Sequence, residues 1–358
     1  MRAWLHRRVV HMWQRRGPVA RALLPLALVH AAWRAVAGWA YRIGLARPAR
    51  VGVPVVVIGN LYAGGTGKTP LVIEVVRALR ARGWHPGVVS RGYGGDTRQP
   101  RLVGPYSRAD ECGDEPLVIY AAAAVPVAVG RDRVLAARLL LGAHPACDIL
   151  VADDGLQHRR LGRELEIAVI HSLGVGNGWL LPAGPLRDPP LRLEGVDAVV
   201  FHGITPAVRV YSPFYFLETS LAEAYPLAAP AQRIGLDALA REQRAARWRV
   251  LAACGIGVPE RFFAMLREHG LVIDELALPD HAALDAERLA RHAYDRVLMT
   301  EKDAVKCRTD GALVHDARLW VVPLRAQIDS GLIDLIESRI ARPGTKSELE
   351  AQRGSKTA

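Results

Sequence analysis

The sequence has few cysteines and no pattern that would pair them. Four are scattered through 358 residues, with no Cys-x-x-Cys pair and no histidine at ligand spacing. Neither a zinc site nor a disulfide framework is therefore indicated, and a reducing cytosol is the simplest compartment. Half of the residues are apolar, which is enough for two modest hydrophobic cores. The cysteines are Cys112, Cys147, Cys254 and Cys307.

No acidic residue occurs before Glu74, so the net charge of +11 is concentrated at one end of the chain. The first fifty residues contain ten arginines and account for ten of the eleven positive charges. A nucleic-acid-binding chain would distribute its positive charge more widely. We predict no nucleic-acid partner, and no protein partner is evident from the sequence.

The sequence lacks an apolar run of the roughly 20 residues that a membrane span needs. Its N-terminal apolar stretch, residues 22–32, is bracketed by Arg21 and Arg34. Arginine side chains bind lipid head groups, and indole rings prefer the boundary between hydrocarbon and water. Residues 1–45 are therefore predicted to form a basic helical segment at an anionic membrane surface. Four of the eight tryptophans lie in this segment: Trp4, Trp13, Trp33 and Trp39.

After residue 45, apolar runs alternate with helical patterns. Runs that are continuously apolar are typical of strands in a parallel sheet that is covered on both faces. Residues 69–82 place their apolar side chains on one helical face, and Gly83 ends the pattern. Residues 46–205 are therefore predicted to form a doubly wound α/β domain. The predicted strands are residues 53–58, 87–90, 125–129, 149–152, 167–170 and 198–201.

A second, shorter series of strand and helix patterns follows. Residues 206–246 include a stretch rich in aromatic and β-branched residues and are predicted to form a ribbon or linker. Residues 247–343 are predicted to form a smaller α/β domain. Residues 344–358 are polar, without apolar periodicity, and are predicted to be a flexible tail. The strands predicted for the smaller domain are residues 249–253, 271–276, 296–299 and 319–322.

A glycine-rich loop joins the first predicted strand to the first predicted helix, and residues 59–70 read GNLYAGGTGKTP. Such a loop binds nucleotide phosphates with its backbone N–H groups, while Lys68 would reach the β- and γ-phosphates and Thr69 would bind Mg²⁺. The strict pattern requires glycine where Tyr62 stands, so this is a variant P-loop. The sequence predicts an ATP-binding protein with a catalytic lysine. The predicted ATP-binding residues are Tyr62, Ala63, Gly64, Gly65, Thr66, Gly67, Lys68 and Thr69.

Two acidic residues follow a second buried strand. Residues 149–155 read ILVADDG, which places Asp153 and Asp154 at the carboxyl end of the strand, where ligands bind in open α/β sheets. A P-loop needs a carboxylate there for Mg²⁺ or its waters. We predict that one of the two serves the metal, and a turn or helix cap built on this pair is the alternative.

Two other interpretations of the basic N-terminal segment stay open. Its apolar stretch and a small-residue site near Ala31 resemble a secretory signal, and the Arg7-Arg8 or Arg15-Arg16 pair resembles a twin-arginine signal. Export would separate an ATP-dependent enzyme from its ATP. The other interpretation is an ordinary core helix.

Seven short motifs occur in a fixed order along the chain. They are GGTGKTP (64–70), SRGYG (90–94), GDEP (113–116), DDGLQH (153–158), LPAGPLR (181–187), GIG (255–257) and TEKD (300–303). Together they resemble the tetraacyldisaccharide 4'-kinases, the lipid A 4'-kinases of Gram-negative bacteria. The resemblance implies a kinase that uses ATP and Mg²⁺ to phosphorylate the 4'-hydroxyl of an acylated glucosamine disaccharide 1-phosphate, giving lipid IVA. It also implies a peripheral or monotopic location on the cytoplasmic face of the inner membrane.

The resemblance further implies roles for individual residues. Asp114 is similar to the family's catalytic aspartate, His281 to the histidine that partners it, and Glu115 to an additional carboxylate on the metal side. The chain departs from the family pattern after His281, where residues 282–284 replace a common second histidine and aromatic residue, and at Leu156, where phenylalanine is usual. The implied acceptor-binding residues are Gln157, His158, Arg187 and Asp188, the last of which stands where glutamate is frequent.

Other classes of protein fit the sequence less well. Switch ATPases with a similar loop place lysine immediately before the two glycines, where this chain has Ala63. A GTPase would need an Asn-Lys-x-Asp element, which residues 300–303 match only at the aspartate. A membrane adaptor without catalytic activity is a third alternative.

Overall fold

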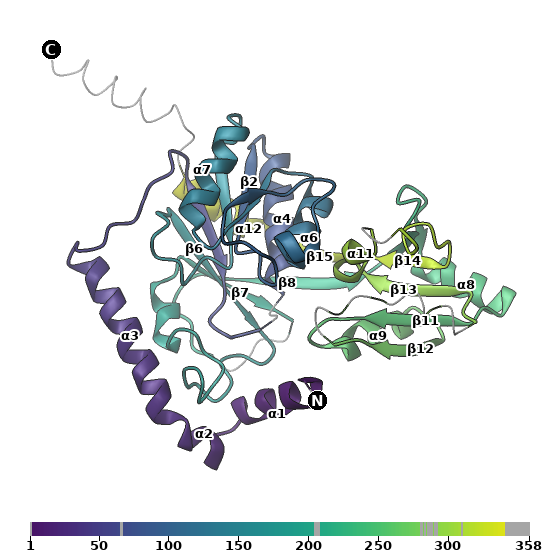
Figure 1. The fold of residues 1–358 in the computed structure, drawn as a ribbon, viewed down its shortest axis with the longest axis horizontal. Helices are drawn as coiled ribbons and strands as arrows, with labels where there is room; N and C mark the ends of the chain where they lie inside the picture. Colours follow the sequence, from purple (N-terminus) through teal and green to yellow (C-terminus); the bar gives the residue numbers. More distant parts are fainter. Residues whose placement is uncertain are drawn as a thin grey trace.

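The computed structural model describes residues 2–64, 67–203, 208–279, 282, 284, 289, 293–308 and 311–340. These residues form a large nine-stranded sheet, a smaller six-stranded sheet beside it, and three N-terminal helices (Figure 1). No helix in these ranges is both long and apolar enough to span a bilayer.

The large sheet is parallel except at its two edges. Its strand order is β15-β8-β7-β6-β1-β5-β2-β4-β3, and only β15 and β3 run antiparallel to their neighbours. Every residue of β1, β2, β5 and β7 is buried, as expected for strands covered on both faces. This confirms the predicted doubly wound α/β core. The strands are β1 (Val55–Gly59), β2 (Pro86–Ser90), β3 (Arg101–Leu102), β4 (Val127–Val129), β5 (Ile149–Asp153), β6 (Leu165–His171), β7 (Ala198–His202), β8 (Phe214–Leu221) and β15 (Leu324–Ile328).

Helices cover both faces of the large sheet. On one face, α4 buries apolar residues at helical spacing, such as Leu71, Val75 and Leu79, and packs beside α6 and α12. On the other face, α7 contributes Val134 and Leu140 to a separate core. The bounds are α4 (Lys68–Ala81), α5 (Ala109–Cys112), α6 (Asp114–Ala123), α7 (Arg133–Ala143), a 3₁₀ helix (Pro190–Gly195) and α12 (Ser330–Arg339).

The smaller sheet has the order β10-β9-β14-β13-β11-β12. Its four strands β11 to β14 are mutually parallel, and β9 pairs antiparallel with both β14 and β10. The elements are β9 (Glu223–Pro226), β10 (Ile234–Gly235), α8 (Leu236–Ala246), β11 (Val250–Cys254), α9 (Pro259–Glu268), β12 (Ile273–Ala277), β13 (Arg296–Thr300), α11 (Glu301–Cys307) and β14 (Leu319–Val322).

The chain crosses between the two sheets differently from the sequence prediction. Residues 206–246 were expected to be a linker, but they contain β8 of the large sheet and β9, β10 and α8 of the smaller one. Residues 247–343 were expected to be one domain, but β15 returns to the large sheet and pairs with β8. Along β8 buried residues recur only every fourth position, so its pattern differs from that of the core strands and does not reveal a sheet strand.

Three helices precede the sheets: α1 (Arg2–Trp13), α2 (Pro18–Ala22) and α3 (Leu24–Arg42). They lie along the outside of the large-sheet domain (Figure 1). Several side-chain contacts hold them there. For example, Trp13 donates from its indole to the Pro182 carbonyl, and Arg34 pairs with Asp188. The helical segment predicted from the sequence is therefore present, and it packs against the core.

Candidate active site

The candidate site forms at the edge of the large sheet where β1 and β5 end. The two strands are parallel neighbours with Ile58 beside Asp153, so the loop after β1 and the acidic pair after β5 leave the sheet together. Within the described part of the loop, Gly64 and Gly67 have positive φ angles of 127° and 77°. A Cβ added at Gly67 would collide with the ring of His202, which lies at the end of β7 closely against the loop.

Lys68 is held at the first residue of α4 by two oxygen atoms. Its Nζ donates to Oδ1 of Asn60 at 3.1 Å and lies 3.5 Å from Oδ1 of Asp154. Only 8% of Lys68 is exposed. The ammonium group is therefore fixed beside the glycine-rich loop, where a nucleotide's phosphates would lie.

Asp154 is the centre of a charged cluster. Arg187 donates both terminal nitrogens to its two carboxylate oxygens at 2.8 Å, and the Arg187 guanidinium also bonds the carbonyl of Asn60. Burial alone would raise the pKa of Asp154, but Lys68 and then Arg187 outweigh it and hold that pKa well below its usual range. Asp154 is thus ionised, and it already forms ion pairs with the side chains of Lys68 and Arg187.

Asp153 has a different environment from its neighbour. It is fully enclosed, and the hydroxyl of Ser90 donates to its Oδ2 at 2.8 Å. Its Oδ1 is buried with no hydrogen-bond partner. Burial, followed by the negative charge of Glu115, raises the pKa of Asp153 to about 7. A bound cation would provide a partner for this buried oxygen.

The residues at this edge fit a magnesium ion, although they do not form a complete protein cage. Among the described residues no three His, Cys, Asp or Glu side chains are grouped to hold a metal. Mg²⁺ in nucleotide sites is bound by one or two protein oxygens, by phosphate oxygens and by waters. The unpaired Oδ1 of Asp153 and the hydroxyl of Thr69, the second residue of α4, are suitable protein ligands.

A second acidic group comes from α6, where Asp114 forms an ion pair with the smaller-sheet domain. Lys306 of α11 places its Nζ 3.3 Å from Oδ2 of Asp114, and both side chains are less than 10% exposed. Lys306 also lies 3.6 Å from Asp303 and donates to the carbonyl of Ala282 at 3.1 Å. The pair therefore joins the two domains and the segment next to His281. His281 itself lies outside the described residues.

Hydrogen bonds connect two of the predicted acceptor-binding residues, Gln157 and Asp188, to Asn60, which holds Lys68. Gln157 donates from Nε2 to the carbonyl of Asn60 and to Oδ2 of Asp188, both at 3.0 Å. Asp188 is buried and pairs with Arg34 of α3. One hydrogen-bonded network therefore connects the glycine-rich loop to the N-terminal helices.

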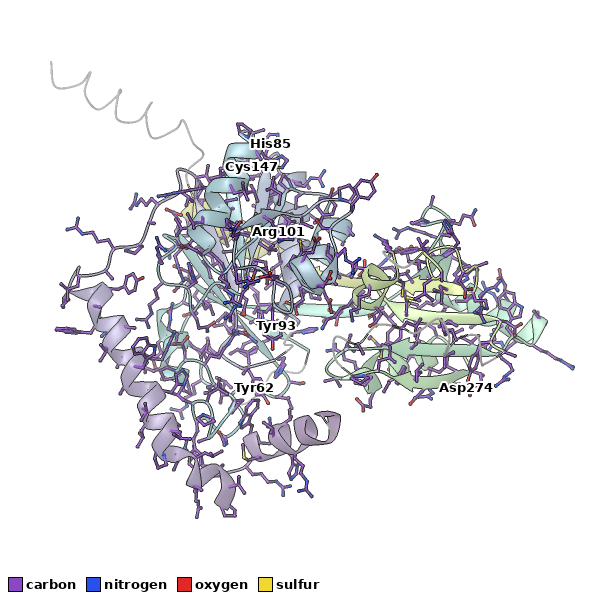
Figure 2. The ribbon with its side chains drawn as sticks, in the orientation of Figure 1. Tyr62, His85, Tyr93, Arg101, Cys147 and Asp274 are labelled. Atoms are coloured by element: carbon purple, nitrogen blue, oxygen red, sulfur yellow. The ribbon has the colours of Figure 1, made fainter. Side chains whose placement is uncertain are left out.

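Tyr62, predicted to bind ATP, contacts the N-terminal helices instead of lying free in the loop (Figure 2). Gln14 donates to its hydroxyl at 3.0 Å, and its ring meets the Trp13 ring edge-on at 6.4 Å between centroids. Burial raises the pKa of Tyr62. Ala63 is the next residue, and its N–H donates to the Pro185 carbonyl. The start of the loop is therefore fixed by neighbouring segments.

A family model of tetraacyldisaccharide-1-P 4'-kinase matches residues 19–341 of the chain. The chain belongs to this kinase family. Two relatives named tetraacyldisaccharide 4'-kinase, from Herminiimonas arsenicoxydans and Thiobacillus denitrificans, are each 46% identical over 335 residues. These matches cover 92% of this chain and 94% and 98% of the two relatives.

The fold is also similar to that of a solved kinase. The structure of LpxK from Aquifex aeolicus, an "apo" form in complex with ATP, superimposes with a TM-score of 0.76 and 24% sequence identity. The match covers 90% of this chain and all of that one. The similarity in fold therefore extends over most of the chain, including both sheets.

Several residues in this kinase site were not predicted from the sequence. Asn60 holds Lys68, Lys306 pairs with Asp114, and Arg34 pairs with Asp188. Asn60 lies two residues after a predicted strand, and its position in the sequence gave a signal. The spacing of Lys306 from Asp303 gave a signal for that contact only, and not for the pairing with Asp114. The side chain of Arg133 is largely buried nearby, and burial, more than the charges around it, lowers its pKa to about 10.

The partly buried environment of His158 can be tested through the pH dependence of the protein's stability. Burial, and after it the positive charge of Arg133, lowers the pKa of His158 from 6.5 to about 4. The unfolded chain takes up this proton near pH 6.5 and the folded kinase only near pH 4, so stability is lost as the pH falls between these values. We expect His158→Gln to remove this part of the pH dependence in urea unfolding. The control variant His144→Gln, which changes an exposed histidine, should retain this pH dependence. Identical plots of stability against pH for the two variants would contradict the lowered pKa of His158.

Proposed function

We propose that the protein transfers the γ-phosphate of ATP to the 4'-hydroxyl of tetraacyldisaccharide 1-phosphate, giving lipid IVA in lipid A biosynthesis. The observation that carries this proposal is the position of Lys68. Its ammonium group is fixed by Asn60 and Asp154 at the start of a helix that follows a glycine-rich loop. That arrangement suits a transferring phosphoryl group.

On the phosphate side, we assign Lys68 to the β- and γ-phosphates and the loop from Tyr62 to Thr69 to ATP binding. Asp153 and Thr69 are assigned to Mg²⁺, because Asp154 is already occupied by Arg187 and Lys68. Glu115 is assigned as an additional carboxylate on the metal side, since its negative charge acts on Asp153. When bound, the metal ion neutralises charge on the β- and γ-phosphate oxygens. Asp154 would then orient Lys68 and Arg187 instead of binding the metal directly.

On the acceptor side, Asp114 is assigned as the base, together with His281. The 4'-hydroxyl oxygen forms a bond to the γ-phosphorus while the bond from that phosphorus to the β-γ bridging oxygen breaks, and ADP leaves. The hydroxyl proton passes to the Asp114–His281 pair. Gln157, His158, Arg187 and Asp188 are assigned to acceptor binding or to the support of the residues that bind it.

The membrane assignment rests on the outer face of α3. Its inner face has Arg34 against Asp188 and the buried residues Ala27 and Gly38. Its outer face exposes large apolar side chains, including Trp33, which is 71% exposed. An exposed apolar helical face within a basic segment suits the surface of an anionic membrane. The large apolar residues of α3 that are exposed are Leu26, Leu28, Val29, Trp33, Val36 and Trp39.

We expect the triple variant Val29→Ser, Trp33→Ser, Val36→Ser to bind anionic vesicles at least roughly tenfold more weakly, because each large apolar side chain contributes about 1.5–3 kcal/mol when buried. ATP binding should not change, since these side chains point away from the core. Vesicle flotation measures the first quantity and nucleotide titration the second. Deleting residues 1–40 is a weaker test, because it also removes Arg34 from Asp188.

The matched control for this triple variant is Tyr106→Ser with Val272→Ser, which removes exposed apolar side chains from other surfaces. We expect this control to bind vesicles like the unmodified protein. Equal losses in both variants would contradict a specific role for α3.

The catalytic proposal is tested by incubating the purified protein with MgATP and the acylated disaccharide 1-phosphate. Mass spectrometry should show a product heavier by one phosphoryl group, and fragmentation should place that group on the 4'-oxygen. Hydrolysis of ATP without a phosphorylated lipid would instead support a membrane-bound ATPase.

A further inference from the structure

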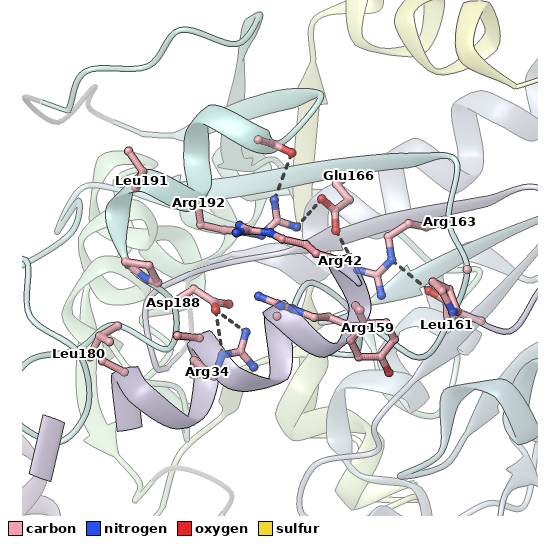
Figure 3. A pocket seen from close by; sticks show the side chains of 18 of the residues that line it. Arg34, Arg42, Arg159, Leu161, Arg163, Glu166, Leu180, Asp188, Leu191 and Arg192 are labelled. Carbon is pink, nitrogen blue, oxygen red and sulfur yellow. Dashed lines mark hydrogen bonds and ion pairs between the residues drawn. The ribbon is translucent and has the colours of Figure 1, made fainter. Parts of the chain in front are cut away.

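A cavity of about 900 Å³ lies between α3 and the large-sheet domain. Figure 3 shows the guanidinium groups of Arg34, Arg159 and Arg192 gathered around it. Six arginines and three carboxylates line the cavity, which leaves an excess of three positive charges. The other charged residues of the lining are Arg42, Arg50, Arg163, Glu164, Glu166 and Asp188.

The three carboxylates already have partners. Asp188 pairs with Arg34 and accepts from Gln157. Glu166 pairs with both Arg163, at 2.9 Å, and Arg192. These pairs neutralise part of the lining and fix the positions of three guanidinium groups.

Glu164, the third carboxylate of the lining, accepts a hydrogen bond from the backbone N–H of Val55 at 2.7 Å. The excess charge therefore resides on Arg159, Arg42 and Arg50, for which the described part of the chain supplies no carboxylate within ion-pair distance. Of these, Arg159 is partly buried, whereas Arg42 and Arg50 are exposed at the rim.

Arg159 is positioned by a glycine in α3. A Cβ added at Gly38 would collide with Nη1 of Arg159, so the guanidinium lies directly against the helix backbone. Glycine inside a helix costs about 1 kcal/mol relative to alanine, and here it provides the space for this guanidinium. Burial, and then the positive charge of Arg34, lowers the pKa of Arg159. An anion bound beside this guanidinium would offset the repulsion from Arg34.

The cavity begins next to the candidate site. Asp188 is part of the lining, and Gln157 connects it to Asn60, which accepts from Lys68. We propose that this cavity is a phosphate-binding subsite, with Arg159 as its principal ligand, that holds the 1-phosphate of the acceptor while the 4'-hydroxyl faces ATP. The inference rests on the proposed function. A guanidinium fork suits a phosphate because two of its N–H groups can donate to two phosphate oxygens.

The direct test compares acceptors with and without the 1-phosphate. In the unmodified protein we expect kcat/KM to favour the phosphorylated acceptor, and in Arg159→Gln we expect this preference to fall on the order of 10- to 100-fold. The matched control is Arg160→Gln, because the adjacent Arg160 is exposed and pairs with Asp132 outside the cavity. An unchanged preference in Arg159→Gln, or an equal fall in both variants, would overturn the proposal.

A steric variant tests the same subsite without removing a charge. Gly38→Ala should displace the Arg159 guanidinium and lower the same preference, while helix propensity favours the alanine. Gly142→Ala is the control, since Gly142 is also in a helix and a Cβ there meets nothing within 4 Å. Preference loss in Gly38→Ala alone supports the subsite, and equal behaviour of the two variants counts against it.

A second arm identifies the source of the phosphate. Binding to phosphatidylglycerol vesicles, relative to phosphatidylcholine vesicles, should be the same for Arg159→Gln and Arg160→Gln. A loss confined to Arg159→Gln, with the acceptor preference intact, would assign the cavity to a membrane phospholipid and overturn the acceptor assignment. Absence of lipid phosphorylation by the unmodified protein would contradict the proposed function itself. Failure of the proposed function can therefore be distinguished from failure of the phosphate-subsite proposal.

Discussion

Lys68→Ala is expected to lower kcat for lipid phosphorylation on the order of 10²- to 10³-fold, the usual effect of removing one donor that stabilises developing charge. We assign the ammonium group to the point where the transferring phosphate gains negative charge, and Asn60 at 3.1 Å and Asp154 at 3.5 Å hold it in place. Arg187, the other cation beside Asn60, is already bound to both carboxylate oxygens of Asp154 and cannot replace it. The measurement is single-turnover phosphorylation at saturating ATP.

The fold of this variant should persist, because both partners of Lys68 keep another donor. Arg187 bonds both carboxylate oxygens of Asp154 and also bonds Asn60. Thermal unfolding should therefore show a cooperative transition. Arg77→Ala is the matched control, since Arg77 is an exposed cation of the same helix that pairs with Glu74. Near-normal turnover in Lys68→Ala would contradict the P-loop assignment.

The sequence predicts this part of the site because its determinants are local. Continuous apolar residues define β1 and β5, helical periodicity defines α4, and the loop and acidic pair lie at the ends of these elements. The predicted bounds of α4 differ from the structure by one residue at each end. Local pattern alone is therefore enough to place Lys68 and Asp154 near one another.

Contacts between distant segments could not be predicted in this way. The pairing of β8 with β15, which brings Leu324 beside Leu221, depends on a register that no local pattern specifies. The Asp114–Lys306 pair joins helices from different domains. The outward apolar face of α3 is recognisable only after Arg34 and Gly38 identify the face that packs inward.

Asp114→Ala and His281→Ala are each expected to lower kcat on the order of 10²- to 10⁴-fold, the usual contribution of a general base. The reason for treating them as one unit is the position of Lys306. Its ammonium group pairs with Asp114 and donates to the carbonyl of Ala282, the residue after His281. The acidic group and the segment that carries the histidine thus share a contact across the two domains.

Groups that share one task give non-additive losses. The double variant should therefore be little slower than the worse single variant, and ATP affinity should barely move, since neither residue belongs to the glycine-rich loop. His85→Ala is the control, because His85 is exposed and contacts Asp148 far from the site along the sheet.

The double-mutant cycle also tests whether the domains act together. We expect the two domains to close around the acceptor before transfer, because closure excludes water as a competing nucleophile. If so, each single variant should raise the ratio of ATP hydrolysis to lipid phosphorylation, and the double variant should raise it no further. If instead the two losses in kcat multiply as independent effects, the paired base is wrong, and His281 would be assigned to binding of the acceptor.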